Sequence, residues 1–86
     1  MKHAGPAALD ALYELLAQVR VRAELREKSR GCFYRKGSGF LHFHEDPAGL
    51  FADLKQGDEF ARFRVSTRGG RAAFLRALRS ELAASP

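Results

Sequence analysis

Two histidines and two acids crowd the stretch FLHFHED, residues 40–46. On a β-strand, side chains two residues apart point to the same face, so we expect His42 and His44 to lie side by side. With the carboxylate of Asp53 they could bind zinc or iron, since imidazole and carboxylate groups are common ligands of these metals. A cross-strand ladder, in which His42 bonds to Asp53 and Asp53 pairs with Arg62, is favoured because the arginine competes for the carboxylate. We therefore predict no metal centre. If the chain did bind a metal, His42, His44 and Asp53 would be the ligands.

Acid–base or nucleophilic catalysis is the second chemistry to weigh. Asp53 could orient His42 as a general base, and Cys32, the only cysteine, would be the nucleophile. The strand pattern described below puts Cys32 on the apolar face, away from His42, where cysteines are usually inert. The chain also has no glycine-rich phosphate loop and no serine elbow, because its KGSG run fits a hairpin turn. The sequence thus predicts a non-enzymatic protein without a cofactor.

A helix is predicted over residues 6–30. Apolar residues recur there at steps of three and four, a proline suits its first turn, and the glycine that follows can end a helix in the left-handed conformation. The five residues before it, MKHAG, are expected to form a flexible N-terminus. A second helix is expected after Ser66 or Thr67, either of which can cap it, and its apolar face spans residues 74–82.

Four short strand-like runs lie between the two helices, each bounded by turn residues: CFYRK, GFLHFHE, GLFADLK and EFARFRV. Links this short favour hairpins, so the strands are expected to form an antiparallel meander. The order of these elements predicts a single two-layer α+β domain over residues 1–86. In this domain a four-stranded antiparallel sheet is flanked by an N-terminal and a C-terminal helix.

The register of the strands decides which side chains face the helices, because a shift of one residue turns every side chain over. Turns built around the Gly-Ser, Pro-Ala and Gly-Asp pairs give one coherent apolar face, which we take as the core. The pairs on that face are Tyr34–Leu41, Cys32–Phe43, Leu41–Leu54, Phe43–Ala52, Leu54–Ala61, Ala52–Phe63 and Leu50–Val65. A bulged three-residue loop at 46–49 is the alternative, and it would set Phe43 opposite Asp53.

The opposite face is predicted to be the interaction surface. It combines four phenylalanines with basic, histidine and acidic side chains: Phe33, Arg35, Phe40, His42, His44, Phe51, Asp53, Phe60, Arg62 and Arg64. An apolar group this large rarely stays in water, so we expect either a partner or a helix of the same chain to cover it. A homodimer is the favoured hypothesis, in which acidic turns of one copy meet arginines of the other.

Nucleic acid is the main alternative partner. The chain has a formal net charge of +5 and a pI of about 10.0. Aromatic rings interleaved with arginines on an open sheet can stack on bases while the cations meet phosphates. The charge is uneven, with acids gathered between residues 45 and 59 and six arginines between residues 62 and 79. Such a chain can also neutralise itself, within the fold or across a dimer.

Size and composition limit the number of domains, the possible disulfides and the expected compartment. At 86 residues the chain is one small domain, and a core of this size makes self-association reasonable. A single cysteine allows no internal disulfide, and with no signal peptide in view it favours the cytoplasm. No apolar run is long enough to cross a bilayer, so no membrane partner is expected.

The order of elements and the run GFLHFHEDPAGLFADLK resemble small bacterial proteins of the MmcQ/YjbR type. The resemblance covers residues 31–65 and implies a frataxin-like α–β–α layout with a comparable strand–turn–strand that ends in Leu-Lys. It also implies a DNA-binding role, and it carries no catalytic residues onto this chain.

Overall fold

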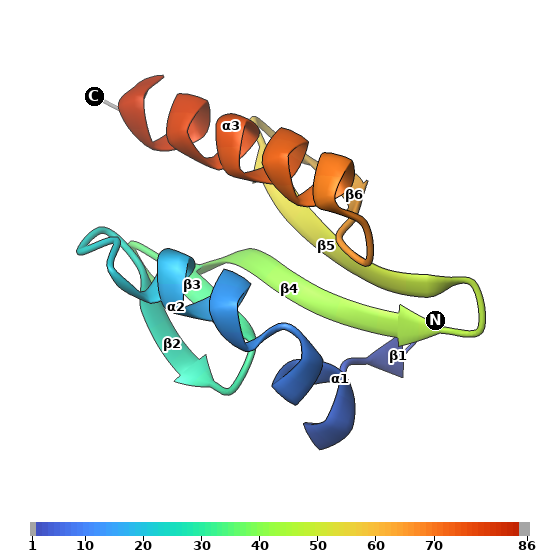
Figure 1. Cartoon of the computed structure of the whole chain (residues 1–86). Coiled ribbons are helices and arrows are strands. Elements are labelled where there is room, and N and C mark those ends of the chain that lie inside the picture. The colour runs from blue at the N-terminus through green and yellow to red at the C-terminus, as the bar shows by residue number, and fades with distance from the viewer. Residues whose placement is uncertain (1, 85–86) are drawn as a thin grey trace.

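The computed structural model describes residues 2–84, which form an antiparallel sheet with helical segments from both ends of the chain (Figure 1). In chain order the elements are β1 (Lys2–His3), α1 (Pro6–Ala11), α2 (Tyr13–Arg20), β2 (Arg26–Ser29), β3 (Cys32–Arg35), β4 (Ser38–Asp46), β5 (Gly49–Gln56), β6 (Glu59–Arg64) and α3 (Arg68–Ala84). The strands follow the order β2-β3-β4-β5-β6, and β1 pairs with β4. The α+β class and the antiparallel sheet are thus confirmed, whereas the expected four strands are six.

The predicted helix over residues 6–30 is shorter than expected. It is interrupted at Leu12 and ends at Arg20, and residues 26–29 form the edge strand β2 instead. Gly31 takes a positive φ of 81°, which lets the chain turn tightly from β2 into β3 rather than end a helix. Pairing with β3 therefore overrides the local helix preference. The charged sequence of β2 also suits a sheet edge, because charged side chains discourage pairing with a second molecule.

The hairpin between β3 and β4 has a different register from the predicted one. Lys36 and Gly37 form its two-residue turn, both with positive φ (51° and 82°), so that Arg35 pairs with Ser38. Further along, β4 holds one more residue than β3 between the pairs that flank Phe40. Phe40 is therefore the extra residue of a β-bulge, and it points into the core together with its neighbour Leu41.

This register turns β3 over relative to the prediction. Phe33, expected on the outer face, is buried in the core with 1 % of its surface exposed. Cys32 and Tyr34, expected in the core, instead share a face with His42, as their pairing and ring contacts show. The turn lies one residue earlier than predicted, which alone shifts the pairing by two residues and keeps the faces. The bulge at Phe40 then moves the pairing back by one, and the net odd shift exchanges the two faces of β3.

The two later hairpins have the predicted register. Leu41 pairs with Leu54 and Phe43 with Ala52 between β4 and β5, and Ala52 pairs with Phe63 between β5 and β6. The bulged alternative at residues 46–49 is not formed, since pairing between β4 and β5 continues without a shift to the Pro47-Ala48 turn. The register of the central strands was therefore predictable from their alternating apolar pattern.

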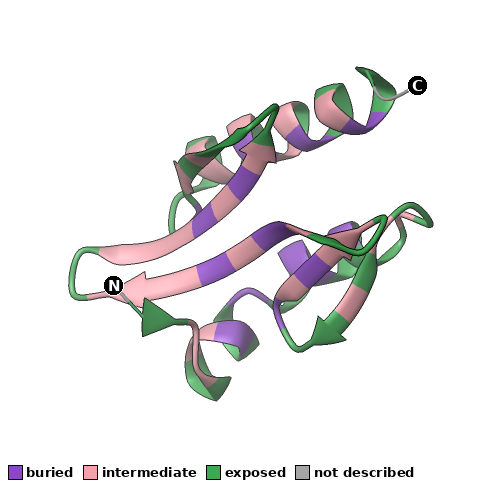
Figure 2. Ribbon diagram, turned by 180° about the vertical axis from the view of Figure 1, so that it is seen from behind, coloured by how far each residue is buried: buried purple, intermediate pink, exposed green. Residues whose placement is uncertain are grey.

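The core lies between the sheet and the helices, which pack on a single face. Figure 2 shows this arrangement from behind, with the sheet nearer the viewer than α3. The buried side chains are Leu9, Leu12, Leu15, Leu16, Val19, Phe33, Phe40, Leu41, Phe43, Ala52, Leu54, Val65, Phe74, Leu78 and Leu82. Because α1, α2 and α3 all contribute to this one cluster, no helix within residues 2–84 crosses to the other face of the sheet. Nor is any of these helices both long and apolar enough to span a membrane.

Helix α3 begins as expected from the sequence. Thr67 caps it by accepting a hydrogen bond from the backbone N–H of Gly70 at 3.0 Å. A Cβ atom at Gly70 would lie 1.6 Å from the carbonyl oxygen of Arg64, so only glycine allows the helix to start this close to β6. Gly70 thus allows α3 to dock on the sheet.

The N-terminus is ordered in the described part, contrary to the expected flexible end. Lys2 pairs with Glu45 and His3 with His44, beyond the point where β3 stops pairing with β4. The N–H of Ala4 donates to the carbonyl of Phe43 at 3.0 Å, and the N–H of Gly5 donates to the Glu45 carboxylate. These bonds bring a third histidine to the sheet.

Candidate functional site

The face of the sheet that no helix covers is the candidate site, and we call it the open face. It is made up of His3, Cys32, Tyr34, His42, His44, Phe51, Asp53, Phe60, Arg62 and Arg64. Three residues predicted for it, Phe33, Arg35 and Phe40, lie elsewhere. Three that it holds, His3, Cys32 and Tyr34, were missed. No signal in the local sequence marks the bulge at Phe40, which brings Cys32 and Tyr34 to this face.

Two rows of side chains cross the strands on this face. One row runs Cys32, His42, Asp53 and Arg62 over β3, β4, β5 and β6. The next row runs His3, His44, Phe51 and Arg64 over β1, β4, β5 and β6. Directly opposed residues in neighbouring strands are close enough to interact, so the two rows set which groups can act together.

Asp53 is the centre of the polar contacts. Its two carboxylate oxygens each accept a hydrogen bond from the Arg62 guanidinium at 2.7 Å, which holds the pKa of Asp53 below its ordinary value. The predicted pairing of Asp53 with Arg62 is therefore confirmed. The expected histidine partner was wrong, since Nε2 of His44, rather than His42, lies 3.4 Å from Asp53 Oδ2.

The three histidines form a cluster beside this carboxylate. Ring centroids of His3 and His44 are 4.8 Å apart, those of His3 and His42 5.7 Å, and those of His42 and His44 6.3 Å. Burial lowers the pKa of both His42 and His44 below the ordinary histidine value, and for each the neighbouring His3 adds to the effect. A lowered pKa favours the neutral imidazole, which can accept a hydrogen bond or bind a ligand through a ring nitrogen.

Cys32 borders the same cluster. Its Sγ lies 3.9 Å from Nδ1 of His3, and it is a free thiol that is only partly buried. The argument that Cys32 points away from His42 was thus wrong, because the two are direct cross-strand partners. Within residues 2–84, no set of three or more His, Cys, Asp or Glu side chains is already arranged around a point where an ion would sit.

A line of aromatic rings crosses the open face diagonally. The ring of Tyr34 is 6.4 Å from that of His42, and His42 in turn stacks on Phe60 with centroids 5.9 Å apart and planes inclined by 23°. Phe60 is 49 % exposed, so the end of the line is open to solvent. We call Tyr34, His42 and Phe60 the ring track.

Cations stand beside the rings of this face. The Lys28 amine is 4.5 Å from the centroid of Tyr34, and the guanidinium groups of Arg62 and Arg64 are each 6.0 Å from that of Phe51. Arg64 also donates to Ser66 and to a backbone carbonyl of the Pro47-Ala48 turn. Tyr34 and Phe51 therefore each lie beside positively charged side chains.

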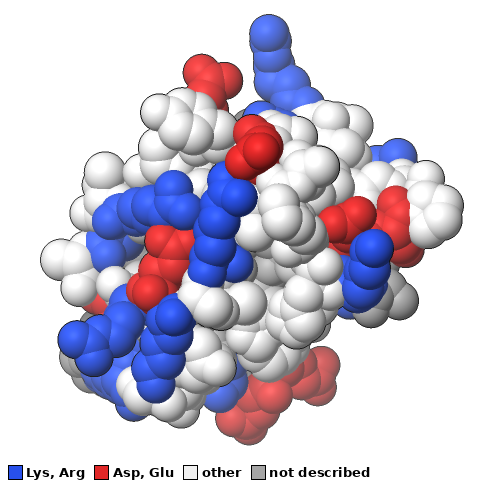
Figure 3. Space-filling view, turned by 90° about the horizontal axis from the view of Figure 1, so that it is seen from below, with Lys and Arg blue, Asp and Glu red and all other residues white. Residues whose placement is uncertain are grey.

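The β2 edge beside Tyr34 is rich in charge of both signs. Arg20 forms an ion pair with Glu27, and Arg30 forms one with Asp10, each at 2.6 Å. Figure 3 views the molecule from below and shows basic side chains gathered around acidic ones in this region. Because only part of the basic charge is paired, the edge next to the ring track keeps an excess of cations.

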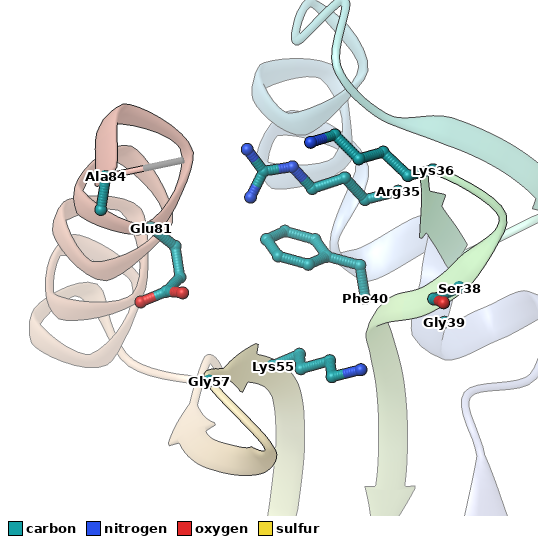
Figure 4. Close-up of a pocket in the computed structure, with 9 residues that line it drawn as sticks. All are labelled: Arg35, Lys36, Ser38, Gly39, Phe40, Lys55, Gly57, Glu81 and Ala84. Atoms are coloured by element: carbon teal, nitrogen blue, oxygen red, sulfur yellow. The ribbon is translucent and has the colours of Figure 1, made fainter. Parts of the chain in front are cut away.

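Arg35 and Phe40 belong to a separate hollow on the helix side of the sheet. Its volume is about 300 Å³, and it lies between the β3–β4 turn and the C-terminal part of α3. In Figure 4 the side chains of Arg35 and Lys36 extend towards α3, and Glu81 lies on the side of α3 that borders the hollow. The guanidinium of Arg35 is 5.5 Å from the centroid of that ring. Arg35 is thus absent from the open face because it faces the helix side with Phe40.

Comparison of the chain with protein-family models, with curated proteins and with solved structures gave no match. The resemblance of residues 31–65 to MmcQ/YjbR proteins therefore stays a prediction.

Proposed function

We propose that this chain is a small, non-enzymatic binding domain of the cytoplasm whose open face binds single-stranded nucleic acid. The single observation that carries the proposal is the ring track, Tyr34, His42 and Phe60, on a sheet face that no helix covers. Single-stranded bases bind proteins by stacking on such rings, with little dependence on sequence. The free thiol of Cys32 is consistent with a reducing compartment.

Cations near the rings supply the second half of the interaction. Lys28 stands at one end of the ring track, and Arg62 and Arg64 flank Phe51 on the neighbouring strand. Phosphates are attracted by such cations, and guanidinium planes can themselves stack on bases. The net charge of +5 strengthens the attraction over longer distances. The resemblance to MmcQ/YjbR proteins implies the same class of ligand.

The homodimer that the sequence favours loses support from the position of two phenylalanines. Phe33 and Phe40 were half of the apolar group expected at a dimer contact, and both are buried in the core. What remains is Phe51, partly buried between arginines, and the half-exposed Phe60. A face in which each remaining ring neighbours a cation or an imidazole is better matched to a polyanion than to a second apolar surface.

The test is fluorescence anisotropy with labelled oligothymidine and the corresponding RNA. Stacking contributes about 1–3 kcal/mol per base, so Tyr34→Ala or Phe60→Ala is expected to weaken binding about 5- to 150-fold. Added salt should weaken binding as well, because counterions compete for the phosphates. Tyr13→Ala is the matched control, since Tyr13 is 67 % exposed on helix α2, away from the open face.

Two results would contradict the proposal. One is the absence of oligonucleotide binding by the wild-type chain at low salt. The other is an equal loss of affinity in Tyr13→Ala and Tyr34→Ala, which would indicate contact with the general basic surface and not with the ring track.

Self-association through the open face is a second candidate, favoured by the exposure of Phe60 on an uncovered sheet. Light scattering over a wide concentration range, at moderate salt, measures it directly. A dimer that is broken by Phe60→Arg and unaffected by Tyr13→Arg would support this candidate. A monomer at every concentration would eliminate it and leave the nucleic-acid proposal standing.

A further inference from the structure

His44 has one ring nitrogen in a polar contact and one without a partner. Its Nε2 lies 3.4 Å from Asp53 Oδ2, whereas its Nδ1 is buried and has no hydrogen-bond partner. Buried polar atoms nearly always have a hydrogen-bond partner, so we expect a ligand to bind this nitrogen.

The contact on the other side of the ring has the form found in metal sites. A histidine that binds a metal commonly donates its second ring N–H to a carboxylate, which fixes the ring and raises its basicity. Asp53 occupies that position for His44 and is itself held by two hydrogen bonds from Arg62. With the Nε2 N–H of His44 directed at Asp53, Nδ1 is the unprotonated nitrogen that can bind an ion.

Two further donors belong to the same cluster. The Sγ of Cys32 and the Nδ1 of His3 are 3.9 Å apart, and sulfur and nitrogen ligands of one tetrahedral zinc ion are about 3.5 Å apart. The ring centroids of His3 and His44 are 4.8 Å apart, and two imidazoles on one zinc ion are separated by about 5 Å. The spacings of His3 from Cys32 and from His44 thus both fit a shared ion.

We propose that Cys32, His3 and His44 bind a zinc ion, or another divalent metal of similar preference, with His42 as the fourth ligand. A mixed thiolate and imidazole set is typical of zinc and is poorly suited to magnesium or calcium. Since no three donors within residues 2–84 already surround one point, the ion draws them together by side-chain rotation. His3 can rotate because it is exposed on a two-residue strand.

Binding at this site would join three strands. His3 belongs to β1, Cys32 to β3 and both His42 and His44 to β4, so an ion would fasten the N-terminal strand to the middle of the sheet. A ligand that binds only the folded chain also raises its melting temperature. The site does not depend on the proposed nucleic-acid role, because its ligand differs and three of its four donors lie outside the ring track; His42 alone belongs to both.

The experiment titrates the purified full-length chain with Co²⁺ and follows its absorption, then displaces Co²⁺ with Zn²⁺. Thiolate ligation gives a near-ultraviolet charge-transfer band, which Cys32→Ser should abolish without disturbing the fold. His3→Ala and His44→Gln should each weaken binding by at least about tenfold, and Asp53→Asn should weaken it about 10- to 100-fold through loss of the carboxylate contact. Asp58→Asn, in the exposed turn between β5 and β6, is the matched control and should bind as wild type.

Melting temperature provides the second readout. Zn²⁺ should raise it in the wild type and in Asp58→Asn, and should not raise it in Cys32→Ser. Equal binding by wild type and Cys32→Ser, or a Co²⁺ spectrum without the thiolate band, would overturn the proposal. Oligonucleotide binding that persists after metal removal by a chelator would separate this site from the proposed function, and neither result depends on the other.

Discussion

Replacement of Phe33 by alanine tests the register that defines the open face. Phe33 is 1 % exposed and its ring packs edge-on against Phe43 with centroids 6.5 Å apart. Removing a buried phenylalanine side chain generally destabilises a protein by about 3–5 kcal/mol, through lost burial and the cavity that remains. A chain of 86 residues has a free energy of unfolding of about 4–13 kcal/mol, so this loss is a large fraction of the total.

Tyr34→Ala is the matched variant, because the register expected from sequence would exchange the two residues. Tyr34 lies on the open face, where its main contacts are His42 and the Lys28 amine, so we expect a loss of about 1 kcal/mol or less. Urea denaturation followed by circular dichroism gives both values from the shift in midpoint at constant slope. Should Phe33→Ala abolish folding, Phe33→Leu, with an expected loss of about 1–1.5 kcal/mol, replaces it. A larger loss for the Tyr34 variant than for the Phe33 variant would refute this register.

Two stability predictions concern the first turn of α3 and the edge strand β2. Gly70→Ala should destabilise the chain by about 1–3 kcal/mol, because its Cβ would lie 1.6 Å from the Arg64 carbonyl oxygen. Gly69→Ala, whose Cβ would meet nothing within 4 Å, should stabilise the chain by up to about 1 kcal/mol. Thermal melts compare the two variants, and equal shifts in melting temperature would contradict the close contact at Gly70. The hydrogen bond from Arg20 lowers the pKa of Glu27, so this carboxylate contributes stability above its ordinary pKa that is lost as pH falls through the lowered value. Glu27→Gln should therefore lower the free energy of unfolding by up to about 1 kcal/mol at neutral pH and by less near about pH 3. The same substitution at the exposed Glu24 is the control. A difference in stability between wild type and Glu27→Gln that stays constant with pH would argue against the ion pair.

The central and C-terminal parts of the fold were predictable because their patterns are local. Apolar and polar residues alternate through β4, β5 and β6, and the Pro-Ala and Gly-Asp turns fix the pairing, so His42, Asp53 and Arg62 were placed together correctly. The Thr67 cap and the apolar face of α3 likewise depend on spacing within one segment. Such features need no knowledge of distant residues.

The structure of the first half of the chain was harder to predict, because its residues have similar local preferences for helix and for strand. Residues 26–29 suit a helix by composition, and only pairing with β3 makes them a strand. Lys36 is not a residue that favours a left-handed turn, yet its positive φ places the turn one position earlier than predicted. The bulge at Phe40 then makes the net shift odd and exchanges the faces of Phe33 and Tyr34.

The sequence by itself determined the α+β class, the antiparallel pairing of β4 to β6 and a sheet face with two histidines, an aspartate and arginines. Only the tertiary structure decided that Phe33 and Phe40 leave that face and that Cys32 and His3 join it. The physical reason is that the outcome rests on a turn, a bulge and a two-residue terminal strand. Each of these changes which backbone groups pair across the sheet, and such pairing is a property of strands that are distant in the chain.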